Sequence, residues 1–437
     1  MTAKASEKQG PITRREFIAK TAAGAVALSA IPGFYTAHGQ VQGANGKLGV
    51  GFIGCGGRSG GHMSMVKQLR DEQYPVELVA CCDVYKPRME QKKKDFGMAK
   101  GFMDYRELLA DPAVDVVCIA TPDHWHAYHA IDAVKAGKHV YCEKPVSHWS
   151  QFKITRELAD LVEKSNCSFV CGAQAMSDSA WHQMKKHVKE GLIGKPLYAE
   201  TGYFRTGDFG ERGMHIDDPN AKPGPDLNWD AFLGPDRPKR AYSVDRHFRW
   251  RLFEDYAGGP LTDLYPHSLT PVMDILGVGM PDAVSGMGGI FCYPYELREV
   301  PDTFSAIAQF PEKVVINIMG TQGNDYQTTT QRGAGFRSPV IRGTDGTLTI
   351  DKNNKEIVFT PVRIVGAKKP QTFPIEHAEN NTELWRNLLE CARTKNRQTW
   401  SPMDLAFRVQ TVLQMAMLSH RSGKTAKFDK AQREIII

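Results

Sequence analysis

The feature that most constrains this chain is a glycine-rich turn between a short apolar run and a helical stretch. Residues 48–53 (Leu-Gly-Val-Gly-Phe-Ile) are apolar, and Gly54-Cys-Gly-Gly-Arg-Ser-Gly-Gly61 follows directly. Residues from about 62 to 69 then have helical character. This order is close to the G-x-G-x-x-G pattern of a strand–turn–helix unit that binds a dinucleotide, with Ser59 at the third glycine position. In such a unit the glycine backbone and the helix N-terminus hold a pyrophosphate.

A second apolar run, residues 76–82, ends in Asp83. A carboxylate there accepts the ribose hydroxyls of the adenosine half and disfavours a 2′-phosphate, which favours NAD over NADP. Lys86 and Arg88 lie nearby and weaken this inference. The alternative is a glycine-rich turn with no ligand. The expected cofactor contacts here are Gly54, Gly56, Gly57, Arg58, Ser59 and Asp83.

Strand-like and helical stretches alternate over the first half of the chain. Further apolar runs lie at 114–120, 139–142 and 168–171, and helical stretches at 128–136 and 152–164. Continuous apolar strands alternating with helices predict a doubly wound parallel sheet that is covered on both faces. The N-terminal half is therefore expected to be an α/β domain of the Rossmann type.

Length and charge exclude several classes of protein. The chain has 437 residues, of which 41% are hydrophobic, enough for two or three domains with real cores. The net charge is +6, and half of it lies in the first 20 residues. The remainder carries too little positive charge for a nucleic-acid footprint, so no nucleic-acid partner is expected.

The N-terminus has the layout of an export signal. Arg14-Arg15 precede Phe17-Ile18, and an uncharged stretch rich in small and aliphatic residues runs to about residue 34. A charged region before a short apolar region is typical of such signals, and the paired arginines resemble the twin-arginine type. The apolar stretch is short for a membrane span, so no integral span is expected. Residues 1–46 are expected to be signal and linker, and the protein to be periplasmic or otherwise exported.

The cysteines support export in the folded state. Their number is odd and their spacing fits no disulfide scaffold. Most fall in apolar runs, where buried free thiols are expected. Many free thiols suit a protein that folds in the cytoplasm before export. The nine are Cys55, Cys81, Cys82, Cys118, Cys142, Cys167, Cys171, Cys292 and Cys391.

Three further motifs carry chemistry. Thr121-Pro-Asp-His-Trp-His126 follows the third apolar run, Glu143-Lys-Pro145 the fourth, and Asp263-Leu-Tyr-Pro-His267 lies in the second half. The spacing of the histidines at 124, 126 and 129 fits no zinc signature, and no metal is expected.

The last two motifs suit the oxidation of an alcohol. A neutral His267 can accept the hydroxyl proton, and Lys144 can hold the oxygen or itself act as the base; the residues alone do not decide between them. Asp263 lies four residues before His267, so on one helix the two would share a face. The alternatives are that Asp263 caps a helix, that His267 is a core histidine and that Lys144 is a solvated strand-end lysine.

Taken together, these motifs resemble the Gfo/Idh/MocA family, the glucose–fructose oxidoreductase and inositol dehydrogenase group, over roughly residues 47–425. The resemblance implies that Lys144, Asp263 and His267 surround the reacting carbinol. It implies further cofactor contacts from Thr121, Pro122, His126, Glu143, Lys144 and Pro145. Arg249, Tyr265 and Trp125 are the expected substrate contacts, because arginines and aromatic rings suit sugars.

The same resemblance implies the organisation and the activity. A Rossmann domain at 47–173 is expected to precede an α+β domain at 174–437 that has an open, mostly antiparallel sheet and closing C-terminal helices. The protein is expected to be a homo-oligomer, dimer or tetramer, that transfers hydride between a sugar or polyol and a tightly bound nicotinamide cofactor. Two alternatives stay open: a redox-neutral NAD-dependent glycosidase or lyase that works through a keto-sugar, and a non-catalytic, cofactor-dependent sugar-binding protein.

Overall fold

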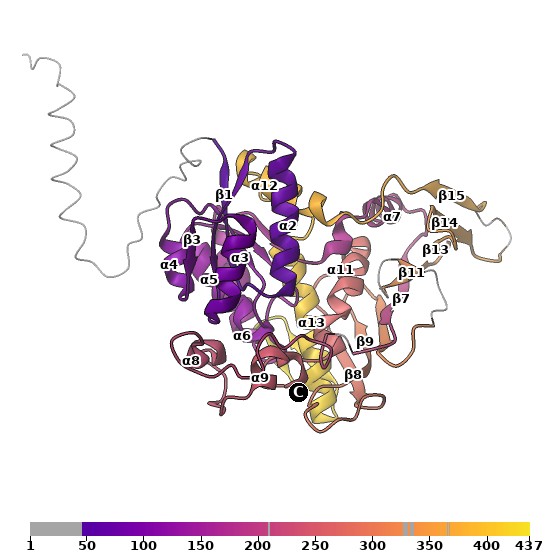
Figure 1. Cartoon of the computed structure of the whole chain (residues 1–437). Helices are drawn as coiled ribbons and strands as arrows, with labels where there is room; N and C mark the ends of the chain where they lie inside the picture. The colour runs from indigo at the N-terminus through magenta and orange to yellow at the C-terminus, as the bar shows by residue number, and fades with distance from the viewer. Residues whose placement is uncertain (1–45, 209, 327–330, 333–335, 365, 367) are drawn as a thin grey trace, which may run out of the picture. The chain divides into compact units, whose positions relative to one another are not determined.

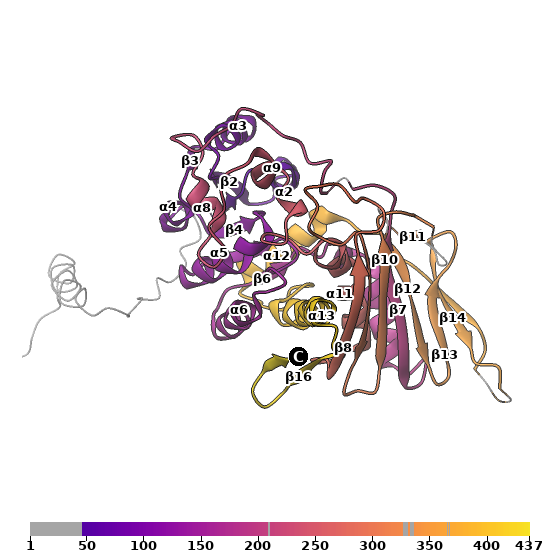
Figure 2. The same ribbon diagram turned by 90° about the horizontal axis from the view of Figure 1, so that it is seen from below.

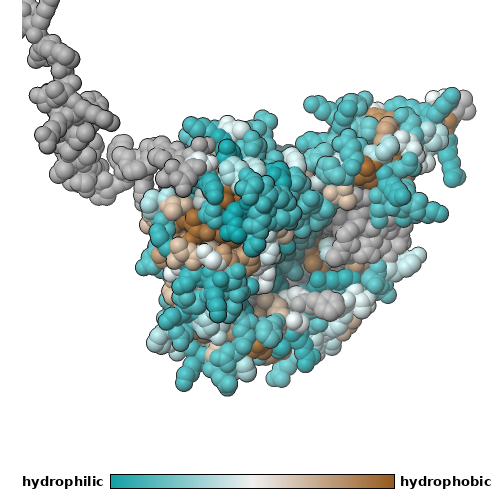
Figure 3. Space-filling model, turned by 45° about the horizontal axis from the view of Figure 1, so that its top comes forward, coloured by the Kyte–Doolittle hydropathy of each residue, from teal (hydrophilic) through white to brown (hydrophobic). Residues whose placement is uncertain are grey.

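The structure, a computed structural model, describes all residues except 1–45, 209, 327–330, 333–335, 365 and 367. The predicted export signal therefore lies outside the described residues. Among the described residues, no helix has the length and apolar character needed to cross a membrane. The face of the molecule in Figure 3 is largely hydrophilic, with apolar residues in small separate areas.

The apolar runs of the first half form a parallel sheet. Its strands join in the order β3-β2-β1-β4-β5-β6, every pair parallel. Figure 1 labels β1 and β3 of this sheet. All residues of β1, β4, β5 and β6 are buried, as expected for strands covered on both faces. The predicted parallel sheet is confirmed, and the short β3 is an addition to it. The strands are β1 (Leu48–Ile53), β2 (Val76–Cys82), β3 (Lys100–Phe102), β4 (Val116–Ile119), β5 (His139–Cys142) and β6 (Phe169–Cys171).

Helices connect these strands. They are α2 (Gly57–Asp71), α3 (Lys86–Phe96), α4 (Tyr105–Ala110), α5 (Asp123–Lys135) and α6 (Phe152–Lys164). Helix α6 has the predicted bounds, whereas α2 and α5 each begin five residues earlier than the sequence indicated. The glycines in the first turn of α2 and the proline just before α5 have low helix propensity, which hides these helix starts in the sequence. Both helices nevertheless begin directly at the turn that follows their strand.

The second half builds a large mixed sheet that is mostly antiparallel. The strand order is β15-β14-β13-β12-β7-β10-β9-β8-β16-β17, with β11 paired to β12, and β7 and β10 run parallel. This confirms the predicted open sheet. Its strands are β7 (Pro196–Phe204), β8 (Ala283–Gly289), β9 (Thr303–Gln309), β10 (Val315–Thr321), β11 (Gln331–Arg332), β12 (Phe336–Gly343), β13 (Gly346–Ile350), β14 (Glu356–Pro361), β15 (Gln371–Pro374), β16 (Ala426–Asp429) and β17 (Glu434–Ile436).

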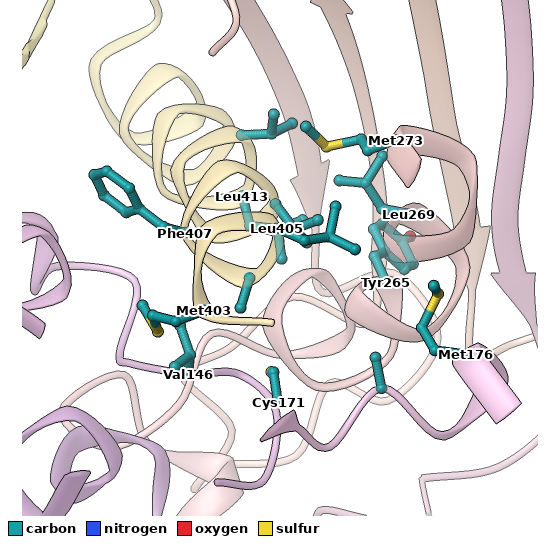
Figure 4. Close-up of a cluster of buried hydrophobic side chains, with 14 of the residues drawn as sticks. Val146, Cys171, Met176, Tyr265, Leu269, Met273, Met403, Leu405, Phe407 and Leu413 are labelled. Carbon is teal, nitrogen blue, oxygen red and sulfur yellow. The ribbon is translucent and has the colours of Figure 1, made fainter. Parts of the chain in front are cut away.

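Two helices lie between the two sheets. In Figure 2, α11 (Tyr265–Leu276) and α13 (Met403–Ser422) lie on one face of the large sheet, on the side of the parallel sheet. Figure 4 shows Leu405 and Leu413 of α13 facing Leu269 and Met273 of α11. These side chains belong to one buried cluster that also includes residues of β4, β5 and β6. The two halves of the chain therefore share a core. The remaining elements of this half are η1 (Gln174–Ser177), α7 (Ser179–Lys189), α8 (Trp229–Leu233), α9 (Val244–Phe248), η2 (Trp250–Leu252), α10 (Pro260–Asp263) and α12 (Asn381–Thr394).

Helix α12 lies late in the sequence but packs on the first domain. Its Trp385 is fully buried and stacks on Tyr141 of β5, with ring centroids 4.6 Å apart. Leu384, Leu388 and Leu389 of the same helix join the cluster formed by β1, β2 and α2. The cofactor side of the molecule thus depends on a segment more than 200 residues away in the sequence.

Asp263 and His267 do not lie on one helix. Asp263 is the last residue of α10, and α11 begins at Tyr265, with Leu264 between them. Pro266, at the start of α11, suits a helix beginning there rather than one running through. The two side chains are therefore not related by one turn of a helix, and Asp263 does not cap α11.

Candidate active site

A cleft of about 1500 Å³ lies at the carboxyl ends of the parallel strands. Gly54 follows β1, Asp83 follows β2, Thr121 follows β4 and Glu143 follows β5, and all four line the cleft. The strand order reverses between β1 and β4, and doubly wound sheets bind ligands at such a switch point. The cleft also has lining residues from the second half of the chain, among them Trp250 and Arg251.

The glycine turn is shaped for close approach of a ligand. Gly54 has φ of 89°, and a Cβ there would lie 2.7 Å from the carbonyl oxygen of Ala120, so only glycine fits. A Cβ at Gly57 would meet nothing within 4 Å, and one at Gly56 only Arg88 Nη1 at 3.8 Å. The space above the turn is therefore open.

The start of α2 also fits the phosphates of a dinucleotide. Its N-cap, Gly56, supplies no side-chain acceptor, so the first-turn N–H groups keep their positive potential for a ligand. Ser59 Oγ is buried behind the turn and has no hydrogen-bond partner among the described residues. Arg58 lines the cleft beside the two glycines. The donors and the open space together suit a pyrophosphate.

Asp83 is held in place by the backbone. Its Oδ2 accepts from Cys55 N–H at 2.7 Å and its Oδ1 from Tyr85 N–H at 2.9 Å. Burial raises the pKa of this carboxyl, while Arg88 and the two N–H groups oppose that rise. Each oxygen accepts one hydrogen bond and can accept another, and Asp83 lines the cleft, which is compatible with the predicted contact to ribose hydroxyls.

Glu143 is the centre of a buried polar network rather than an open cofactor contact. Its Oε1 accepts from Arg58 Nε at 2.7 Å, His62 Nε2 at 2.8 Å and Gln174 Nε2 at 2.8 Å. The side chain is almost fully buried, which opposes ionisation, but Arg58 and His62 hold its pKa well below the usual range. Glu143 therefore fixes the position of Arg58 beside the glycine turn.

Three supporting residues of this network were missed in the sequence: His62, Gln174 and Trp385. Trp385 Nε1 donates to His62 Nδ1 at 2.9 Å, so His62 must carry its proton on Nε2 and donate it to Glu143. Burial lowers the pKa of His62, consistent with this neutral tautomer. The only sequence signal was a histidine in the helix after the turn, since Trp385 lies in a closing helix to which no role was assigned.

Thr121, Pro122 and His126 lie where the sequence predicted, but His126 faces the backbone. Its Nδ1 lies 2.6 Å from the carbonyl oxygen of Pro145, and its Nε2 lies 2.8 Å from that of Thr121. Burial lowers the pKa of His126, and a neutral ring donates to only one of these carbonyls. His126 thus ties the loop after β4 to the Glu143–Pro145 segment. Pro145 contributes this carbonyl and does not line the cleft.

Lys144 and Asp263 bring the two halves of the chain together. Lys144 Nζ donates to Asp263 Oδ1 at 2.7 Å and to the Asp263 carbonyl oxygen at 2.5 Å. Arg251 Nε donates to the same Oδ1 at 3.3 Å. Burial opposes ionisation of Asp263, but Lys144 and Arg251 hold its pKa far below the usual range. The carboxylate therefore stays charged and anchors two cations.

His267 lines the cleft near this pair. Burial, followed by the charge of Lys144, lowers its pKa to about 3. Neither ring nitrogen has a hydrogen-bond partner among the described residues, and neither is fully buried. A neutral imidazole with a free nitrogen on the cleft can accept a proton.

Of the predicted substrate contacts, the structure brings one to the cleft. Trp125 lines it and donates from Nε1 to the Phe232 carbonyl at 2.9 Å. Tyr265 is fully buried and donates to the Phe304 carbonyl at 2.6 Å, away from the cleft. Arg249 pairs with Asp245 at 3.1 Å and does not line the cleft. Arg251, two residues later, takes the position expected for Arg249.

The histidines at 124, 126 and 129 do not form a metal site, and no group of side chains in the described part of the chain could hold a metal ion. His124 Nε2 donates to the Phe232 carbonyl at 2.9 Å, and His129 stacks on Trp125 with ring centroids 4.6 Å apart. All nine cysteines are free, and all but Cys292 are buried.

Comparison with known proteins agrees with this geometry. Residues 48–173 match the family model described as "Oxidoreductase family, NAD-binding Rossmann fold", and residues 177–285 match "Oxidoreductase family, C-terminal alpha/beta domain". Together the two matches cover more than half of the chain.

Two curated relatives are similar over part of the chain. Levoglucosan dehydrogenase from Pseudarthrobacter phenanthrenivorans is 33% identical over 134 residues, 31% of this chain and 31% of that protein. Myo-inositol 2-dehydrogenase from Thermotoga maritima is 31% identical over 147 residues, 34% of this chain and 42% of that protein. The chain thus aligns with less than half the length of each relative.

The solved structures extend the likeness in fold to most of the chain. A levoglucosan dehydrogenase in complex with NADH and L-sorbose has a TM-score of 0.66. It covers 87% of this chain and 98% of its own, at 18% identity. At 18% identity the similarity supports a shared fold only. In this chain that fold has two parts, the parallel-sheet domain and the large mixed sheet.

Proposed function

The chain belongs to the Gfo/Idh/MocA oxidoreductase family with an NAD-binding Rossmann domain, and from that premise we propose that it is a sugar or polyol dehydrogenase. It would transfer hydride between a secondary alcohol of the substrate and a nicotinamide cofactor. The observation that carries the proposal is the Lys144–Asp263 contact of 2.7 Å, which joins the two halves in one cleft beside His267. Relatives named as dehydrogenases of levoglucosan and myo-inositol support this activity over a sugar-binding protein without turnover. The redox-neutral glycosidase stays the second candidate, because a relative named alpha-N-acetylgalactosaminidase, from Shewanella oneidensis, is 30% identical over 165 residues.

The cofactor is held by residues of the first half. The N–H groups at the start of α2 and the open glycine turn would bind the pyrophosphate, and Asp83 the adenosine ribose. When bound, the nicotinamide supplies the hydride acceptor or donor. NAD is favoured because the Asp83 carboxylate repels a 2′-phosphate.

The catalytic roles follow from the hydrogen bonds in the cleft. Lys144 donates to two oxygens of Asp263, and its third ammonium hydrogen has no partner within the described chain. It is therefore placed to donate to the substrate hydroxyl oxygen and to stabilise negative charge that develops there. Asp263 orients Lys144. His267 is neutral and lines the cleft, so it can accept a hydrogen bond from the substrate hydroxyl, but a pKa of about 3 makes it a weak base. His267 and Lys144 therefore remain the two candidate bases.

The test has two parts. First, the protein is purified without added nucleotide and denatured, and the released NAD and NADP are quantified by chromatography. Second, the loaded protein is mixed with a panel of sugars and polyols, and NADH formation is followed by absorbance at 340 nm. We expect bound NAD and NADH formation with at least one alcohol. If neither nucleotide binds, or if no alcohol reduces bound NAD, the proposal is wrong.

A lysine variant tests the site. Lys144→Met removes the ammonium and should lower the rate of hydride transfer by about 10³, within the range for loss of one such group, while NADH still binds. Lys153→Met, on an exposed position of α6, is the control and should keep the wild-type rate. A Lys144→Met protein with wild-type activity would contradict the assignment.

We also propose that the protein is exported through a twin-arginine signal and forms homo-oligomers. Alternate residues of β9 are exposed, and Ile307 of β9 and Met287 of β8 are 53% and 79% exposed, so the outer face of the large sheet offers an apolar surface for self-association. Ile307→Asp should lower the mass measured by light scattering if this face is the interface.

Replacement of Arg14 and Arg15 by lysine should retain the protein in the cytoplasm if the signal is functional.

A further inference from the structure

Beyond Lys144, the cleft has a substrate end that is rich in positive charge. We use this term for the part formed by Gly210, Met214, Trp250, Arg251, Asp263 and His267. A sugar oxidised next to Lys144 must extend into this space. The groups on its walls therefore decide which sugars fit, provided that the proposed dehydrogenase activity holds.

Arg251 is the group with unused binding capacity. Its Nε donates to Asp263 Oδ1 at 3.3 Å and its Nη1 contacts Met214 Sδ at 3.6 Å, a weak acceptor. No described residue accepts from its Nη2, and the side chain is 23% exposed, toward the cleft. The guanidinium lies over Trp250, 4.2 Å from the ring centroid, which fixes its plane. A rigid fork with free donors is the usual partner of a planar carboxylate.

The charges around Arg251 do not balance. Asp263 Oδ1 is shared by Lys144 and Arg251, so one carboxylate faces two cations. Arg205 adds a third cation; its Nη2 lies 3.4 Å from Glu211 Oε2, and its buried Nε has no partner among the described residues.

The neighbouring acids restore only part of this balance. Burial, together with Asp263, raises the pKa of Glu211, while Arg205 opposes the rise, so Glu211 is the partner of Arg205. Burial raises the pKa of Asp123 to about 8, and this carboxyl is therefore mostly neutral at pH 7. The substrate end thus has a surplus of positive charge that a neutral sugar leaves uncompensated.

We propose that the substrate is an acidic monosaccharide and that Arg251 binds its carboxylate in the substrate end of the cleft. A carboxylate there supplies the missing negative charge and the acceptors that Nη1 and Nη2 lack. This inference rests on the proposed function and narrows its substrate class from sugars in general to sugar acids. Arg251 is then the residue that determines specificity, whereas Lys144 and His267 carry out the reaction.

The experiment measures binding and turnover with matched pairs of sugars. The NADH-loaded protein is titrated by calorimetry with D-glucuronate and D-glucose, and with D-galacturonate and D-galactose, each pair differing at one carbon. Turnover of the same sugars is measured with NAD. We expect at least one acid to bind ten times more tightly than its neutral counterpart, with an affinity that falls as salt is added.

Variants at two nearby arginines separate recognition from packing. Arg251→Met should abolish the preference for the acid, and Arg251→Lys should keep part of it because the charge remains but the fork is lost. Arg249→Met is the matched control. Arg249 Nε donates to the Met214 carbonyl at 3.2 Å, so Arg249 contacts the same residue as Arg251, but it does not line the cleft. This variant should keep the preference for the acid. If Arg251→Met does not fold, as judged by circular dichroism, the Arg251→Lys result decides.

Several outcomes would overturn the proposal. These are equal binding of acid and neutral sugars, no binding of either acid, or an equal loss of affinity for both members of a pair in Arg251→Met and Arg251→Lys. Turnover of neutral sugars alone would refute the inference but leave the dehydrogenase function standing. Absence of nucleotide binding, or failure of every sugar and polyol to reduce bound NAD, would instead refute the function itself.

Discussion

Replacing Glu143 by glutamine tests whether the buried network supports the cofactor turn. Three donors meet at Glu143 Oε1, from Arg58, His62 and Gln174, at 2.7 to 2.8 Å. Oε2 accepts from Lys144 N–H at 3.2 Å. Glutamine has the same shape, so the substitution removes the charge and one acceptor without creating a cavity.

The cost in stability can be worked out from these contacts. If the amide oxygen takes the Oε1 position, the three donors keep an acceptor, but that acceptor is no longer charged. This costs about 1 kcal/mol for the hydrogen bond from Arg58, whose side chain is 39% exposed. The amide NH₂ then faces Lys144 N–H, which leaves a buried donor without an acceptor and costs about 1–3 kcal/mol. The opposite orientation is worse, because it sets the NH₂ against three donors. We expect Glu143→Gln to lower the free energy of unfolding by about 3 kcal/mol.

The assay is urea unfolding at pH 7, combined with NADH titration by fluorescence. The control is Glu77→Gln, since Glu77 is half-exposed and pairs with Lys47 at 3.3 Å and Arg70 at 3.4 Å, contacts that are worth less than about 1 kcal/mol. NADH affinity should fall in Glu143→Gln only, because Arg58 loses its anchor beside the turn.

The pH dependence gives an independent check. The pKa of Glu143 is depressed in the folded state, so its stabilisation is complete above the ordinary glutamate pKa and declines as the pH falls below it. The difference between wild type and Glu143→Gln should shrink in the same range. A loss below 1 kcal/mol at pH 7, equal to that of the control, would refute the reasoning.

Two further predictions follow from named residues. Asp83→Asn keeps an acceptor for one of the two backbone N–H groups that Asp83 binds and removes the charge. With Arg88 nearby, it should raise the affinity for NADP relative to NAD by about tenfold, measured by competitive titration. An unchanged ratio would remove Asp83 from the discrimination. Burial lowers the pKa of His124 to about 3, so His124 stays neutral in the folded protein, whereas the histidine of the unfolded chain becomes protonated below pH 6.5. The free energy of unfolding should therefore fall by on the order of 2 kcal/mol between pH 7 and 5. The stability of His124→Gln should therefore fall less over that range than that of the wild type, and parallel pH curves would contradict this.

The first half of the fold was accessible from sequence because its signals are local. The strands at 48–53, 76–82 and 139–142 are continuous apolar runs, which have one interpretation when helices alternate with them. The break between α10 and α11 was harder to predict. The four-residue spacing of Asp263 and His267 suggests one helix, and the only local signal for the break is Pro266, which favours the first turn of a helix.

The site shows the same division between local and distant information. Motifs that follow strand ends come together because the carboxyl ends of parallel strands meet at one edge, and so Gly54, Asp83 and Glu143 were predictable. His62 and Trp385 were not, since a hydrogen bond between residues 323 positions apart leaves no pattern in the sequence. The choice of Arg251 over Arg249 depends on which side of a short 3₁₀ turn faces the cleft.

The segment over the cofactor side of the cleft bears on how the nucleotide is kept. Asp217 and several residues of 228–235 line the cleft, and the segment 217–235 is bonded to the first domain at two places. On one side, Lys86 N–H donates to the Asp226 carbonyl at 2.9 Å and Arg88 pairs with Asp217 at 2.7 Å. On the other, His124 and Trp125 donate to the same carbonyl of Phe232. These bonds tie the segment to the first domain beside the cleft, and we expect them to slow the release of a bound nucleotide. An exported enzyme that has no external pool of NAD needs a cofactor retained in this way, which makes the NAD content of the purified protein the measurement that links the cleft to the proposed export.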